Sequence, residues 1–442
     1  MGPGQRRRPR IESEGEAGMM TTIELLRANE KVSGYKINIH KKESMELFFV
    51  KGKLETVRRT NTCDKEVTVY VDHGEFKGDS QFFVYPSTTQ EQLKKLIDEA
   101  VEKALLINNQ NYELPGAETG EYAVESNFAD YDSAELATMI SRAVFDANTV
   151  ENASLNSVEV FINKHTETVL NSKGLQKTQV RYDAMVEAIP TYNGENMSVE
   201  LYEQYNFGSL DEKALHDEIA EKMAEVKARF EAVKPEYPLS GTVILNKHEL
   251  ASLFFNIASD LNFATVYSHS NLWSKGDAIQ KEPQGDVIGI TMAGQVEGST
   301  RSSRFDSDGL SLGSVRIVDG GKAAAYYGSN RYGQYLGEAP TGDLWCLVAD
   351  AGTAAADSFT SGNYLEVVSM SGLQVDFYND YIGGEVRLAY YHDGENTVPV
   401  TGVSISGKLS QVLDKILFSS ERAVQGGYFG PAKAALRDMT IF

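Results

Sequence analysis

The chain has 442 residues, 41% of them hydrophobic and 24% charged, which is enough for two or three domains of ordinary globular composition. Its formal net charge of −21 argues against direct binding of nucleic acid, because an acidic surface repels phosphate. No apolar run reaches the length of a membrane span, and the two distant cysteines, Cys63 and Cys346, favour a cytoplasmic chain with reduced thiols.

Residues 1–18 differ in composition from the rest of the chain and lack the apolar core of a signal peptide. We therefore expect a disordered extension there. The folded part should begin at residue 19, with Thr21 and Glu24 at capping-box spacing to start a short helix.

Two related units are expected next, at residues 19–107 and 133–231, with a polar linker at 108–132 between them. Each unit reads as a helix, then strands of alternating polarity, then a second amphipathic helix. When the first unit is aligned with the second by a shift of about 122 positions, the order of elements agrees and several residues are identical. The matched pairs are Lys42 with Lys164, Lys51-Gly52 with Lys173-Gly174, Thr56 with Thr178, and Arg59 with Arg181.

Residues 232–442 form the third region, which is rich in glycine and in short apolar runs that indicate strands. The segment 315–326 reads as a hairpin around Asp319-Gly320-Gly321. The predicted fold class is therefore α+β: two related helix–antiparallel sheet–helix units followed by a larger β-rich C-terminal domain.

The segment 241–260 reads as a buried strand that runs directly into an amphipathic helix, with Asn246 as N-cap. His248-Glu249 matches the first half of a zinc-peptidase motif, but no second histidine follows one turn later. These two residues are better explained as residues of the first helical turn.

Together with this strand and helix, three later segments resemble the TldD/PmbA (TldE) family, whose members are called modulators of DNA gyrase. They are FDSDGLSLGSVRIVDGGK (305–322), TSGNY (360–364) and VPVTGVSISGKLSQVLDKI (398–416). The resemblance covers residues 20–442. It implies a relation to zinc peptidases, because the TldD branch carries an HExxxH helix and a cysteine near the C-terminus.

In this chain the first two positions and the last position of that motif fall on Phe255, Asn256 and Asp260, and the cysteine would fall within 426–430, GGYFG. None of the histidines, the glutamate or the cysteine is present. The resemblance is therefore to the PmbA/TldE branch, with no catalytic or metal-binding residue in this chain. It implies a cytoplasmic subunit, without a cofactor of its own, that pairs with a TldD-like zinc peptidase or with itself and helps to degrade small or unfolded peptides.

A peptide groove in this family-like domain is expected near the loop after the helix, with His269, Arg331, Tyr332 and Tyr335 as candidate contacts; local hydrogen bonding and packing are the alternative roles. Two other functions stay open. The chain could be a self-associating metallopeptidase with an atypical site at His248, Glu249 and His269. It could also be a non-proteolytic interaction protein that modulates gyrase or a toxin–antitoxin system.

Overall fold

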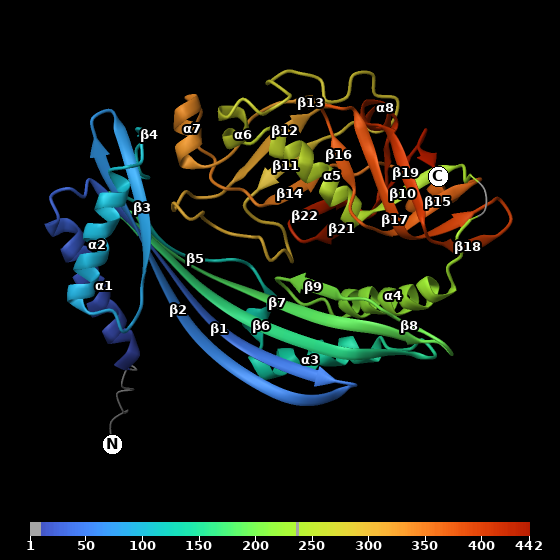
Figure 1. The fold of residues 1–442 in the computed structure, drawn as a ribbon, viewed down its shortest axis with the longest axis horizontal. Coiled ribbons are helices and arrows are strands. Elements are labelled where there is room, and N and C mark those ends of the chain that lie inside the picture. Colours follow the sequence, from blue (N-terminus) through green and yellow to red (C-terminus); the bar gives the residue numbers. More distant parts are fainter. Residues whose placement is uncertain (1–9, 236–237) are drawn as a thin grey trace.

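The computed structural model describes residues 10–235 and 238–442. The described residues form three sheets flanked by helices, and the α+β class expected from the sequence is confirmed. The N-terminal half contributes one long curved sheet, and the C-terminal domain lies along one side of it (Figure 1).

The N-terminal sheet has the order β4-β3-β2-β1-β6-β7-β5, and β8 and β9 also pair with β7. Its bounds are β1 Gly34–Val50, β2 Lys53–His73, β3 Phe76–Val84, β4 Asn109–Gln110, β5 Thr119–Ala123, β6 Ala153–Asn171, β7 Gln176–Asn193, β8 Ser198–Glu200 and β9 Glu203–Phe207.

Both predicted units contribute to this sheet, and each supplies two helices, α1 Arg10–Ala28 with α2 Gln90–Ala104 and α3 Ser133–Asp146 with α4 Glu212–Glu231. The helix–sheet–helix order therefore occurs twice. The two units share one sheet, because β1 pairs antiparallel with β6 along its length. The predicted linker adds β4, β5 and the short 3-10 helix η1 Asn127–Asp130 to this half.

The N-terminus differs from the expected disordered extension. Helix α1 begins at Arg10 and not at the predicted cap, so Thr21 and Glu24 lie inside it. The preceding stretch contains Glu12, Glu14, Glu16 and Ala17, which favour helix, so the helix extends N-terminal of the capping pattern. Residues 1–9 of the predicted extension lie outside the described residues.

The C-terminal domain contains the other two sheets. One has the order β20-β23-β10-β15-β17-β19-β24, with β16 and β18 also on β17, and the other has the order β13-β12-β11-β14-β22-β21. The strands are β10 Thr242–Asn246, β11 Ile290–Ala293, β12 Ser314–Asp319, β13 Lys322–Ala323, β14 Cys346–Ala349, β15 Tyr364–Met370, β16 Gln374–Asp376, β17 Tyr381–His392, β18 Thr397–Val400, β19 Val403–Lys408, β20 Leu417–Phe418, β21 Arg422–Gln425, β22 Tyr428–Pro431, β23 Lys433–Leu436 and β24 Thr440–Ile441.

The helices of this domain are α5 Lys247–Asp260, α6 Phe263–Tyr267, α7 Asn330–Leu336 and α8 Leu409–Lys415, with a 3-10 helix η2 at Ala356–Thr360. Helix α5 buries Leu250, Leu253, Phe254 and Ile257 in a core shared by both sheets. No helix in the described ranges combines the length and apolar character that a membrane span needs.

Candidate functional site

Helix α5 follows β10 without a loop, and the sequence explains this junction. The side chain of Asn246 accepts a hydrogen bond from the backbone N–H of His248 at 2.8 Å, which caps the first turn. The ring of Phe254 packs at 5.5 Å from Phe418 and at 5.8 Å from Tyr428, measured between centroids. These contacts fix which residues of the helix face away from the core.

The three positions aligned with the zinc motif hold no metal-binding arrangement. Phe255 offers no ligand atom, and the exposed Asn256 donates its amide to the carbonyl of Ser252 at 2.9 Å. Asp260 is buried and accepts backbone N–H groups from Leu272 at 2.7 Å and Trp273 at 3.1 Å. The carboxylate at the last position therefore fixes the following loop, and these residues do not fit a zinc ion.

The segment aligned with the family cysteine does lie beside this part of α5. A side chain built at Gly427 would come within 3.4 Å of the ring of Phe255 and would collide with the backbone carbonyl of Trp345. The guanidinium of Arg301 lies over the Phe255 ring at 5.8 Å. The space that a cysteine at position 427 would need is therefore filled.

The alternative site of His248, Glu249 and His269 is not brought together. His248 lies in the first turn of α5 and His269 follows α6, and these residues form no group of ligand atoms close enough to hold a metal ion. His248 is exposed, whereas Glu249 is buried, with Oε2 lacking a hydrogen-bond partner. Burial raises the pKa of Glu249 to about 7.

Three of the four predicted groove residues do cluster. The guanidinium of Arg331 lies 5.5 Å from the ring of Tyr332 and 5.6 Å from that of Tyr335, and the ring of Tyr267 packs against both tyrosines. His269 lies two residues beyond Tyr267 and is exposed, with a left-handed φ of 55°.

The same cluster joins the two halves of the molecule. The hydroxyl of Tyr335 donates to the carbonyl of Gln110 at 2.6 Å, and Arg331 donates to the side chain of Asn109 at 2.6 Å. Gln334 and Glu113 also exchange hydrogen bonds. Helix α7 therefore docks on the predicted linker, and Arg331 and Tyr335 contribute to this contact between domains; their role in a groove stays a prediction.

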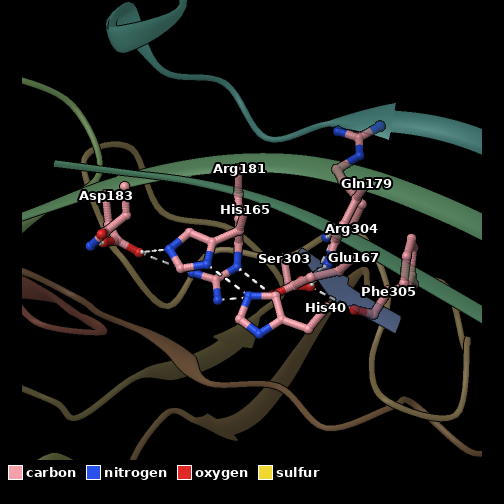
Figure 2. Close-up of polar contacts among 10 residues, drawn as sticks. His40, His165, Glu167, Gln179, Arg181, Asp183, Ser303, Arg304 and Phe305 are labelled. Atoms are coloured by element: carbon pink, nitrogen blue, oxygen red, sulfur yellow. Dashed lines mark hydrogen bonds and ion pairs between the residues drawn. The ribbon is translucent and has the colours of Figure 1, made fainter. Parts of the chain in front are cut away.

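Sequence reasoning missed a second polar cluster, on the face of the N-terminal sheet that meets the C-terminal domain (Figure 2). It contains His40 of β1, Asn163, His165 and Glu167 of β6, and Gln179, Arg181 and Asp183 of β7. The signal was available in the strings N-x-H-x-E and Q-x-R-x-D, because alternate residues of a strand share one face.

This cluster also contacts the C-terminal domain directly. Gln179 donates to the hydroxyl of Ser303 at 2.9 Å and accepts the backbone N–H of Arg304 at 2.8 Å. Nearby, Lys36 of β1 bonds Asp308 at 2.5 Å. Polar pairs of this kind position the sheet against the loop 303–308.

Comparison with known proteins gives one sequence family and several related folds. Residues 239–442 match the family described as PmbA/TldA metallopeptidase C-terminal domain. No curated protein sequence matches the chain significantly.

Solved structures with a similar fold include TldE from Thermococcus kodakarensis, at 13% identity and a TM-score of 0.76, covering 97% of this chain and 99% of that chain. A protein described as a candidate modulator of DNA gyrase from Bacteroides thetaiotaomicron aligns at 12% identity and a TM-score of 0.76, covering 97% and 98%. A second candidate gyrase modulator, from Thermotoga maritima, aligns at 13% identity and a TM-score of 0.73, covering 96% and 100%. Identities this low establish a shared fold alone.

Proposed function

Because the C-terminal domain of this chain, residues 239–442, belongs to the PmbA/TldD family, we propose that the chain is a PmbA/TldE-type subunit of a peptidase complex without a zinc site of its own on α5. The observation that carries the proposal is the state of the motif positions on α5. Phe255 packs with Arg301, Asn256 bonds its own helix and Asp260 holds a loop. All three side chains are committed to structure.

The catalytic metal belongs, in this proposal, to a TldD-like partner subunit. A zinc ion in such a partner would supply an activated water for peptide hydrolysis. The two subunits would enclose a cavity in which the peptide is cut. This chain would contribute part of the wall of that cavity and part of the surface that binds the peptide. A cytoplasmic location and small or unfolded peptide substrates complete the proposal.

Strand β2 offers a surface on which an extended peptide or a partner strand could add. Its residues 65–73 pair with β3, whereas along residues 53–64 only β1 pairs with it among the described strands. Leu54 and Val57 on this stretch are 51% and 49% exposed. An open sheet edge with exposed apolar side chains is a common site of strand addition.

The test is to purify this chain alone, a TldD-like partner alone, and the two together, and to measure cleavage of an unfolded peptide. We expect hydrolysis by the complex and none by this chain. Replacing the glutamate of the partner's HExxxH motif should abolish the hydrolysis, whereas Asn256→Ala in this chain should leave it unchanged. A Leu54→Lys, Val57→Lys double variant should raise KM or weaken the complex.

Two results would overturn the proposal. Zinc-dependent hydrolysis by this chain alone would make it a peptidase in its own right. A stable complex without any hydrolysis would instead support the interaction-protein alternative, in which the chain acts on another protein such as a gyrase.

A further inference from the structure

Two histidines and a glutamate meet on the face of the N-terminal sheet that lies against the C-terminal domain. The register pairs His40 of β1 directly with Glu167 of β6, and His165 lies two residues before Glu167 on the same face. One ligand atom from each of the three residues lies within 4.8 Å of the other two. Nε2 of His40 is 2.8 Å from Nδ1 of His165 and 3.9 Å from Oε1 of Glu167.

A second set of residues holds these groups in place. Oδ2 of Asp183 lies 2.7 Å from Nε2 of His165, on the ring edge opposite His40 (Figure 2). Asn163 donates to the same carboxylate at 2.6 Å. Nε2 of His165 lies close to this carboxylate but makes no hydrogen bond of good geometry. With the proton on Nε2, beside the carboxylate, the lone pair of Nδ1 faces His40 and Glu167.

Glu167 is oriented in the same way. Arg181 donates to its Oε1 at 2.9 Å and Gln179 donates to its Oε2 at 2.8 Å, and each carboxylate oxygen keeps a further lone pair. The two imidazoles and this carboxylate, which forms an ion pair with Arg181 at 2.9 Å, make up the proposed ligand set.

Charge also favours a cation. The carboxylates of Glu167 and Asp183 exceed the single guanidinium of Arg181 by one negative charge. Nε2 of His40 and Nδ1 of His165 share a hydrogen bond whose donor depends on the tautomers of the two rings. A metal bound by both nitrogens would replace this hydrogen bond and would require the proton of His40 to be on its Nδ1.

We propose that His40, His165 and Glu167 bind one divalent transition-metal ion of the zinc type. Two nitrogen ligands at tetrahedral angles around zinc lie about 3.3 Å apart, so the imidazoles need to separate by only about 0.5 Å. The side chain of His165 is 7% exposed and that of His40 is 39% exposed, so the ion enters beside His40. A fourth ligand, such as water, would complete the coordination on that side, as three protein ligands with one open position are typical of a reactive metal site.

The test uses the full-length chain without a histidine tag, titrated with Co²⁺ as a spectroscopic probe and with Zn²⁺ by calorimetry. We expect about one ion per chain and a visible Co²⁺ absorption of a site with nitrogen ligands. His165→Gln and Glu167→Gln should each weaken binding by at least about 100-fold, and Asp183→Asn by about 10- to 100-fold. His73→Gln, in the same sheet but outside the cluster, is the matched control and should bind as the parent does.

Absence of binding in the parent chain would overturn the proposal, and so would binding that survives in both His165→Gln and Glu167→Gln. Circular dichroism and gel filtration show which variants fold. If His165→Gln does not fold, His40→Gln takes its place, because that ring is at the open side of the cluster. The outcome is independent of the peptidase assay, since it concerns metal bound by this chain without a partner.

Discussion

The buried carboxyl of Glu249 should make the stability of the C-terminal domain depend on pH near neutrality. Its side chain lies at the start of α5 and is 8% exposed, and Oε2 has no hydrogen-bond partner. Burial raises its pKa from 4.5 to about 7, although nearby backbone N–H groups and Lys222 oppose the shift. The folded protein therefore binds this proton more tightly than the unfolded chain does.

The difference between the folded and unfolded pKa values of Glu249 sets how stability depends on pH. The contribution of Glu249 to the free energy of unfolding is greatest below about pH 4.5, decreases as the pH rises toward 7, and stays low above pH 7. The full change corresponds to about 3 kcal/mol, because each unit of pKa is worth about 1.4 kcal/mol. Glu249→Gln removes the ionisation. The free energy of unfolding of this variant, relative to that of the parent chain, should therefore increase by about 2 to 3 kcal/mol between pH 5 and pH 8.

Urea unfolding followed by tryptophan fluorescence measures this quantity, because both tryptophans, Trp273 and Trp345, belong to the C-terminal domain. Glu221→Gln, an exposed position on α4, is the matched control, since it removes the same charge where water solvates it. The reasoning would be refuted if Glu249→Gln gained no stability relative to the parent at pH 8, or if the control showed the same dependence on pH.

Four further substitutions test the account of the site on α5 and of the domain contact. Asp260→Ala should lower the free energy of unfolding by about 2 to 4 kcal/mol, because two backbone N–H groups lose a charged acceptor, whereas Asn256→Ala should change it by less than about 0.5 kcal/mol in the same fluorescence assay. Gly427→Cys should not create a zinc site and should cost about 1 to 3 kcal/mol, since its side chain meets the carbonyl of Trp345; zinc bound at this thiol would contradict that geometry. Tyr335→Phe should cost about 1 kcal/mol and speed amide exchange in residues 109–113, and unchanged exchange there would show that the hydroxyl does not hold α7 on this segment.

Local patterns in the sequence were sufficient for many elements of the fold. The Asn246 cap sets the start of α5, and the glycine pair after Asp319 makes the hairpin of β12 and β13. The repeat of about 122 positions anticipated the duplicated order of helices and strands. These features depend on neighbours in the chain, which is why periodicity and turn residues predict them.

Long-range pairing was beyond such patterns. Nothing local indicates that β1 pairs with β6, yet this pairing merges the two units and places His40 beside His165, which is 125 positions away. Short segments of the predicted linker became strands because the sheet supplied partners for them. The docking of α7 on residues 109–113 is of the same kind, as its hydrogen bonds join residues more than 200 positions apart.

The two sides of α5 explain why this domain can keep its fold whether or not it binds a metal. One side buries Leu250, Leu253, Phe254 and Ile257 between two sheets, and the domain core depends on it. The other side carries Asn256, which is exposed and bonds its own helix, and Phe255, which is partly buried at the margin of this core beneath Arg301. Residues on this second side can differ between proteins at little cost to the fold. Similarity of fold therefore predicts the position of α5 and leaves the presence of a metal there to be decided by the residues on its outer side.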